Sequence, residues 1–384
     1  MKSFNKNSLV FVFAMIFVIA GIFSKIGSIF ENVRNNLDEI FSQKLNYHAQ
    51  MMDINSIKDN LLGMKVVVSK NVVKTDSGKL VQLESQYTSD EIHKTVLRIA
   101  ELQSVAENMG ANFLYCAVPH KSYYENVPEN VFDYEKQNYE EFVRQLGTEK
   151  ISHIDMVPLF RNDKIQDNDL YYRTDHHWKS TVGFVAAKHI CEELNKRYGF
   201  SYEKEFTDID NYTVTTFPKL FLGAYGKKVG TYFTWKGADD FDLITPNFDS
   251  DILYEDPPST PIKQGSFDDV LLNKDYLIKD YYHKINYNVY MPAKHHIRSF
   301  KNNLADNEKA KMLVVRTSYA QVVTPFLILQ NKETYVCDVR NNQGYEGDKG
   351  NLKEYIESLK PNYVLVLYDG VYSVNYSDQR YNFF

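Results

Sequence analysis

The segment "TDHHW" places an acid, two adjacent histidines and a tryptophan at consecutive positions, Asp175 to Trp178. Histidine is the side chain best suited to proton transfer near neutral pH, and it also binds metals. A carboxylate beside an imidazole fixes which ring nitrogen carries the proton, so that the other nitrogen can take a proton from a nucleophile. If the loop is extended, residues i and i+2 share a side, so Asp175 would hold His177 while His176 faces away. The alternative is a surface loop that merely contains histidines.

A candidate nucleophile, Ser318, follows a buried apolar run. The segment "KMLVVRTSYAQVVTPFL" reads as a strand that leads through Ser318 into a helical segment. Ligands of open α/β sheets bind beyond the carboxyl ends of the strands, and backbone amides at the start of the helix could stabilise an oxyanion. With His177 as general base and Asp175 as its orienting acid, Ser318 would complete a catalytic triad. The same position also suits a serine that only caps the helix.

A metal site is the competing interpretation of the histidines. His120, His153 or Asp155 could complete a zinc site with the "DHH" residues. Adjacent histidines are unusual as joint ligands of one ion, and neither an H-E-x-x-H motif nor a paired Cys/His spacing accompanies them. The sequence therefore favours the triad and predicts no bound metal and no cofactor.

Strands and helices alternate on both sides of these residues, which is typical of a parallel α/β sandwich. The clearest helix begins at Thr88, which can form a capping box with Glu91, and stops at Gly110. Further helices are expected at 139–147, 180–199 and 350–360, and buried strands at 111–119, 151–157, 311–318, 334–339 and 362–370.

The remaining segments divide the chain into unequal parts. Residues 31–85 are expected to form a helical or irregular stalk and a β-hairpin that turns at 76–78. Residues 86–384 would form the main α/β domain, in which the aromatic, turn-rich segment 200–306 is an irregular β-rich insertion over the core.

Composition excludes some classes of protein. With 384 residues, of which 43% are hydrophobic, the chain can bury a sizeable core. Its formal net charge of -6 lacks the excess of Lys and Arg with which proteins bind nucleic acid, so nucleic acid is not expected as a partner. Cys116, Cys191 and Cys337 lie in apolar stretches and are expected to be buried thiols.

The N-terminal segment 1–30 carries an export signal. Lys2 and Lys6 precede an uncharged run whose apolar core extends from Leu9 to Phe23, and no small-x-small cleavage site follows it clearly. By the positive-inside rule the N-terminus stays in the cytoplasm. The sequence therefore predicts a single-pass signal anchor in the cell membrane with the body outside, or a secreted protein if the signal is cleaved.

Several motifs together resemble the DHHW family. They are "CAVPHKSYY", "TDHHW", "FLGAYGKKVG", "DDFDLITP", "VVRTSYAQVVTPFL" and "NLKEYIESLKPNYVLVLY", and they extend over most of residues 90–370. That family is similar to the SGNH-hydrolase-like domain of the alginate O-acetylation proteins AlgJ and AlgX. The resemblance implies a three-layer, flavodoxin-like and permuted fold, with Asp175 as orienter, His177 as general base and Ser318 as nucleophile. The chain departs from the family pattern at Thr317, where an Asp usually precedes the serine.

The function that the resemblance implies is O-acyl transfer. A membrane-bound O-acyltransferase would supply the acyl group, and an extracytoplasmic polysaccharide would accept it through an acyl-Ser318 intermediate. A carbohydrate acetylesterase uses the same chemistry with water as acceptor. A non-catalytic, glycan-binding scaffold of a modification complex is the alternative from another class, supported by Thr317 and the aromatic segment 200–306.

Overall fold

The computed structural model describes residues 48–256, 260–291, 297–306, 310–339, 352–369, 381 and 383. The predicted N-terminal anchor, residues 1–30, lies outside these residues. None of the described helices has the length and apolar character needed to cross a bilayer.

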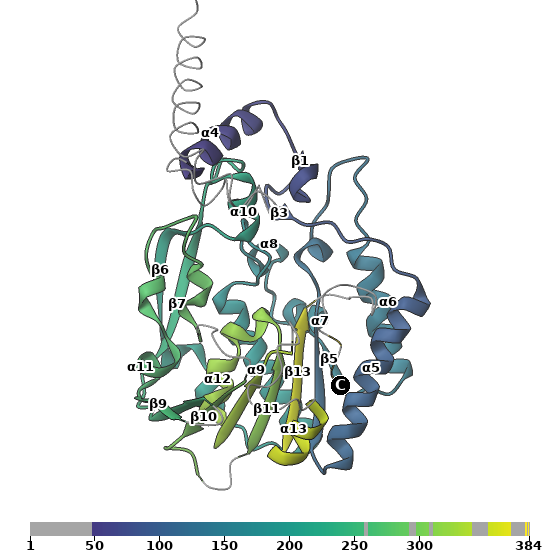
Figure 1. Ribbon diagram of the computed structural model, residues 1–384, viewed down its shortest axis with the longest axis vertical. Coiled ribbons are helices and arrows are strands. Elements are labelled where there is room, and N and C mark those ends of the chain that lie inside the picture. Colours follow the sequence, from purple (N-terminus) through teal and green to yellow (C-terminus); the bar gives the residue numbers. More distant parts are fainter. Residues whose placement is uncertain are drawn as a thin grey trace, which may run out of the picture.

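The body is built on a mixed sheet of eight strands (Figure 1). Five neighbouring strands at one side are parallel, and the remaining three extend the sheet in antiparallel fashion. In spatial order the strands are β5 (His153–Asp155), β4 (Asn112–Val118), β13 (Tyr363–Asp369), β11 (Lys311–Arg316), β12 (Glu333–Cys337), β10 (Ile297–Asn302), β8 (Ile252–Asp256) and β9 (Thr260–Gly265).

Helices cover both faces of the parallel strands, which explains why these strands read as apolar runs. Alternate residues of β4 enter different clusters: Leu114 and Cys116 pack with helices α9 and α12, whereas Phe113 and Tyr115 pack with α5, α6 and α13. The expected three-layer arrangement is therefore present. The covering helices are α9 (Ser180–Tyr198) and α12 (Thr324–Gln330) on one face, and α5 (Ser89–Asn108), α6 (Glu135–Thr148) and α13 (Leu352–Leu359) on the other.

The prediction of a parallel sheet with an irregular β-rich insertion at 200–306 over the core is wrong in part, because the sheet is mixed. Strands β8, β9 and β10 of this segment continue the main sheet, because β10 pairs antiparallel with β12 and covers its open edge. Only β6 (Tyr212–Phe221) and β7 (Asp239–Pro246) form a separate two-stranded ribbon.

Local signals in the sequence were sound elsewhere. Thr88 and Glu91 form the predicted capping box of α5. The predicted hairpin joins β2 (Val72–Lys74) to β3 (Leu80–Val81), beside the short β1 (Val66–Val67). All three cysteines are buried thiols, as predicted. The other described α-helices are α4 (His48–Leu61) in the predicted stalk, α7 (Met156–Asn162), α8 (Asp167–Leu170), α10 (Ala224–Val229) and α11 (Phe267–Leu271).

Close packing of α9 against the segment that follows β11 gives a test of the fold. A Cβ atom added at Gly183 of α9 would lie 2.2 Å from Cγ2 of Val322. We expect Gly183→Ala to lower the free energy of unfolding by about 1–3 kcal/mol, the usual cost of overpacking. Gly147→Ala in α6 is the matched control, since its Cβ meets nothing within 4 Å. Denaturant titration measures both, and equal stability of the two variants would contradict the packing described here.

Candidate active site

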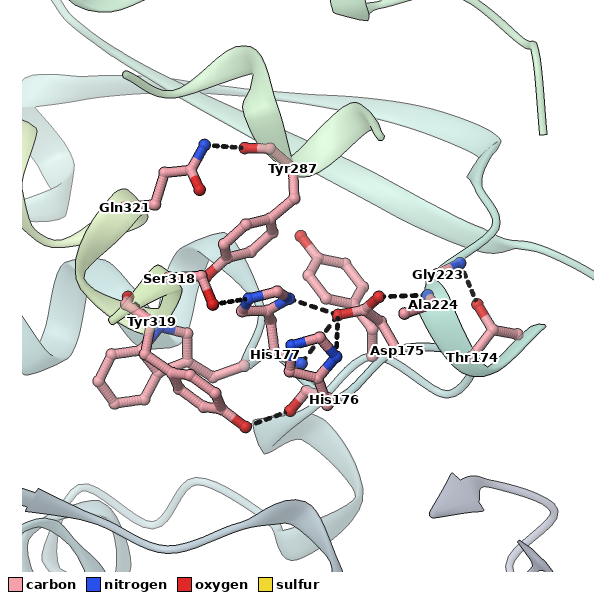
Figure 2. Close-up of polar contacts among 12 residues, drawn as sticks. Thr174, Asp175, His176, His177, Gly223, Ala224, Tyr287, Ser318, Tyr319 and Gln321 are labelled. Carbon is pink, nitrogen blue, oxygen red and sulfur yellow. Dashed lines mark hydrogen bonds and ion pairs between the residues drawn. The ribbon is translucent and has the colours of Figure 1, made fainter. Parts of the chain in front are cut away.

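Ser318 lies where the sequence placed it, just beyond the carboxyl end of β11. It begins the 3-10 helix η8 (Ser318–Val322), whose N-cap is Thr317 and has no capping side-chain hydrogen bond. The Oγ atom of Ser318 lies 2.7 Å from Nε2 of His177 (Figure 2). The serine hydroxyl therefore points at the histidine and does not cap the helix.

His177 is held by Asp175 on its other side. Nδ1 of His177 lies 2.5 Å from Oδ1 of Asp175, and the backbone N–H of His177 donates to the same oxygen at 2.9 Å. The second carboxylate oxygen, Oδ2, accepts the N–H of Ala224 at 2.6 Å. Burial opposes ionisation of Asp175, but the two neighbouring imidazoles and these hydrogen bonds outweigh it and hold its pKa well below the usual range. The three predicted site residues thus form one continuous hydrogen-bonded chain.

The prediction that His176 faces away is wrong. The loop is not extended, because the carboxylate of Asp175 accepts the N–H of the residue two positions on and turns the backbone. As a result the rings of His176 and His177 lie 3.8 Å apart, and Nδ1 of His176 is 3.6 Å from Oδ1 of Asp175 (Figure 2). Burial and the neighbouring His177 lower the pKa of His176 to about 3, so this ring is neutral at physiological pH.

Aromatic side chains fix the position of the His177 ring. Tyr287, from the 3-10 helix η7 (Asn286–Val289), stacks on it with a centroid distance of 4.1 Å and an interplanar angle of 18°. The hydroxyl of Tyr319 donates to the backbone carbonyl of His176, and Nε1 of Trp178 donates to the carbonyl of Tyr319. These contacts tie the "DHHW" loop to the turn that carries Ser318.

A buried lysine holds the backbone of the same loop. Lys121 donates from Nζ to the carbonyls of Leu80, Arg173 and Asp175, at 2.6, 2.7 and 3.1 Å. Three carbonyls need three N–H groups, which only the ammonium form supplies. Burial lowers the pKa of Lys121 to about 7. Lys121 therefore links strand β3 to the loop of the candidate triad, and this linkage was not predicted from the sequence.

Thr317 is bonded to a carboxylate from the neighbouring strand. Its hydroxyl donates to Oδ1 of Asp369, the last residue of β13, and the other carboxylate oxygen lies 3.3 Å from Nε2 of His120. Burial lowers the pKa of His120, but the carboxylates of Glu135, Glu84 and Asp369 outweigh it and raise that pKa well above its ordinary value. A carboxylate therefore stands beside position 317 although the chain itself has threonine there.

The additional ligands that the metal interpretation required are occupied elsewhere. His153 Nδ1 contacts the carbonyl of Ile151, Asp155 caps α7 and accepts from Tyr139, and His120 lies among carboxylates. Within the part of the chain that the structure describes, the group of possible metal ligands is Asp175, His176 and His177, whose ligand atoms lie within 4.8 Å of one another. Two of these atoms already form the Asp175–His177 hydrogen bond, which a metal ion would have to replace.

One family model matches part of the chain. Residues 80–216 match the family model described as "SGNH hydrolase-like domain, acetyltransferase AlgX". The resemblance predicted from the sequence is confirmed. No curated protein matches the chain.

Two solved structures share the fold over most of the chain. Bacillus cereus PatB1 with a sulfonyl adduct is 19% identical, with a TM-score of 0.62 over 81% of this chain and 97% of PatB1. A DHHW family protein from Eubacterium siraeum is also 19% identical, with a TM-score of 0.58 over 79% of this chain and 92% of the other. The O-acetyltransferase domain of Pseudomonas putida AlgJ is more distant, at 13% identity and a TM-score of 0.44 over 78% of this chain and 91% of that domain.

The close contact between Gly223 and Asp175 gives a test of the site geometry. A Cβ atom at Gly223 would lie 2.1 Å from Cβ and 2.6 Å from Cα of Asp175, so Gly223→Ala must displace the acid. A displacement near 1 Å costs on the order of 100-fold in rate, and we expect such a loss in the kcat/KM for a soluble acetyl ester. Gly147→Ala serves as control because its Cβ meets nothing. Wild-type turnover in Gly223→Ala would show that the position of Asp175 does not matter.

Proposed function

We propose that the protein is an extracytoplasmic O-acyltransferase that carries an acyl group on Ser318 and passes it to a hydroxyl of a polysaccharide. The observation that carries this proposal is the hydrogen-bonded chain from Asp175 through His177 to the Ser318 hydroxyl. The match of residues 80–216 to an acetyltransferase family model supports acetyl as the acyl group.

In the first half-reaction, Oγ of Ser318 attacks the carbonyl carbon of the donor ester while Nε2 of His177 takes the hydroxyl proton. The bond to the donor's leaving oxygen or sulfur then breaks, and that atom takes the proton from Nε2. The products are acyl-Ser318 and the free donor alcohol or thiol. Asp175 keeps the proton on Nδ1 and stabilises the imidazolium that forms between the two proton transfers.

In the second half-reaction, the acceptor hydroxyl attacks acyl-Ser318 while His177 takes its proton. The bond to Oγ breaks, and Oγ recovers a proton from Nε2, which restores the starting state. The polysaccharide leaves as an ester. If water takes the place of the sugar hydroxyl, the same steps make the protein an acetylesterase, so exclusion of water decides between the two activities.

The cellular arrangement in this proposal follows from the N-terminal sequence. Lys2 and Lys6 before the apolar run Leu9–Phe23 support a signal anchor with the body outside the membrane. A membrane-bound O-acyltransferase would then deliver the acyl group from the cytoplasmic side. If the signal is cleaved, the body is secreted, and the chemistry at Ser318 is the same.

Substitutions in the triad test the proposal. With an activated acetyl ester as substrate, Ser318→Ala and His177→Ala should each lower kcat by at least about 10³-fold, and Asp175→Asn nearly as much. Ser318→Ala should unfold near the wild-type temperature, since the hydroxyl bonds only within the site. His176→Ala should cost far less, because the hydroxyl of Ser318 is hydrogen-bonded to His177.

Three results would contradict the triad. They are full turnover in Ser318→Ala, a larger loss in His176→Ala than in His177→Ala, and bound zinc that disappears with either histidine. The last result would replace the triad with a metal site on Asp175, His176 and His177.

A further inference from the structure

Helix α4 packs its polar side chains against the body of the protein. Asn60 donates from Nδ2 to the carbonyl of Tyr232 at 2.9 Å, and the hydroxyl of Ser56 accepts the N–H of Tyr232 at 3.1 Å. Asp53 accepts the N–H of Thr231 and the hydroxyl of Tyr282. Ser56 and Asn60 are the buried residues of this helix. The helix is thus attached through its polar face.

The outward side of α4 carries exposed apolar side chains among exposed polar ones. Ile54, Ile57 and Leu61 are spaced by three and four residues and so share one side of the helix. Ile54 and Leu61 are 64% and 69% exposed. The exposure continues beyond the helix, where Val68 is 86% exposed. A helix at a water-facing surface normally has the reverse arrangement, with its apolar stripe toward the core.

A second segment, which is bonded to the buried polar side of α4, also bears exposed aromatic residues. Tyr232 and Trp235 follow α10, and Trp235 is 67% exposed. The loop that bears them is fixed to α4 and β2, because Lys74 bonds both Asn60 and the carbonyl of Phe233. Figure 1 shows α4, β1 and α10 together at one end of the molecule, away from α13 and β9. The α4 patch consists of Ile54, Ile57, Leu61, Leu62, Met64, Val68, Tyr232 and Trp235.

The surroundings of the α4 patch are basic although the whole chain carries a formal charge of -6. The segments 48–76 and 224–238 that bear the patch contain seven lysines and three aspartates, without glutamate or arginine. Five of these lysines are exposed: Lys58, Lys65, Lys70, Lys228 and Lys236. Apolar side chains with an exposed tryptophan and flanking lysines are the composition with which proteins lie on bilayers that contain anionic lipids.

The most apolar segment of the chain precedes the α4 patch in the sequence, with residues 24–47 between them. The residues before His48, the first residue of α4, include the uninterrupted apolar run Leu9–Phe23. We propose that the α4 patch docks onto the surface of a lipid bilayer with anionic headgroups. This proposal does not depend on the chemistry at Ser318.

The docked surface and the triad share helix α10. At its start, the N–H of Ala224 holds Asp175. At its end, Gly230 packs so closely on α4 that a Cβ there would lie 2.4 Å from Cβ of Ser56 and 2.5 Å from the carbonyl oxygen of Met52. Bilayer contact through α4 would therefore hold the candidate active site within one short helix of the membrane-facing surface.

The intrinsic tryptophans make the docking measurable. The chain has two, of which Trp178 is fully buried and Trp235 is exposed. The full chain is reconstituted in phosphatidylcholine–phosphatidylglycerol vesicles, with and without lipids brominated on their acyl chains. We expect the brominated lipids to quench most of the Trp235 emission. Trp235→Phe, which retains only Trp178, should show almost no quenching.

Two variants address the patch itself while the chain stays on the vesicle. Ile54→Ser/Leu61→Ser/Val68→Ser changes exposed side chains only and should lose most of the quenching. Lys58→Glu/Lys65→Glu should also lose most of the quenching in the anionic vesicles, because the new carboxylates are repelled by the anionic headgroups. Cosedimentation confirms that each variant remains bound to the membrane, so that a loss of quenching reports the patch and not the anchor.

Absence of quenching in vesicle-bound wild type would overturn the proposal, as would quenching that both variants retain. A second copy of the chain is the main rival occupant. Because the three native cysteines are buried, Leu61→Cys supplies the reactive thiol for a cross-linking assay. Efficient cross-linking between two copies of the Leu61→Cys variant, without quenching, would show that two chains cover each other's patch, and the bilayer proposal would be wrong.

Discussion

The buried carboxylate of Asp175 is the constraint on which the rest of the site depends. This side chain is ionised and has almost no access to water, and an ionised group in such a place is tolerated only when it is paired and hydrogen-bonded. Its partners are the ring and backbone of His177 and the N–H of Ala224. The backbone on either side is fixed in turn, since Asp239 accepts hydrogen bonds from Thr174, and Lys121, shortly after β4, donates to the carbonyl of Asp175 itself.

The sheet supplies the other half of the site. Three adjacent parallel strands, β4, β13 and β11, end at the same edge of the sheet. Asp369 is the last residue of β13, His120 comes two residues after β4, and Ser318 comes two residues after β11. The hydrogen bond from Thr317 to Asp369 joins two of these strand ends directly beside the nucleophile. The family that the sequence resembles usually has an Asp where this chain has Thr317, and here the neighbouring strand brings the carboxylate of Asp369 within hydrogen-bond distance of Thr317. Thr317 is therefore weaker support for a non-catalytic scaffold than the sequence alone indicated.

The sequence predicted those parts of the site that depend on residues close together along the chain. Ser318 follows a recognisable strand, and Asp175 and His177 lie two residues apart. Other contacts could not be predicted from the sequence, because Lys121 is 54 residues from Asp175 along the chain and Ala224 is 49 residues from it. No spacing rule connects such distant residues. The position of His176 was mispredicted for a local reason, since an aspartate that bonds its own backbone two residues on makes a turn and not an extended segment.

In the fold as well, local features were predicted correctly and long-range pairing was not. The capping box of α5 and the runs of buried strands are local signals, and they gave the correct elements. The antiparallel strands β8, β9 and β10 were assigned to an irregular insertion over the core, because nothing in their composition shows which edge of the sheet they will cover. Pairing with β12 is decided by the open edge of the parallel sheet, a feature that exists only once the chain has folded.

The most direct measurement of the central claim is the mass of the peptide that contains Ser318 during turnover. The protein is mixed with an activated acetyl ester in the absence of a sugar acceptor, quenched in acid within the first turnovers, and digested for mass spectrometry. The account predicts an acetyl group on Ser318 that accumulates in the wild type, disappears when a polysaccharide acceptor is added, and never forms in His177→Ala. Turnover without an acetylated Ser318, or an acetyl group on a different residue along the reaction path, would contradict it.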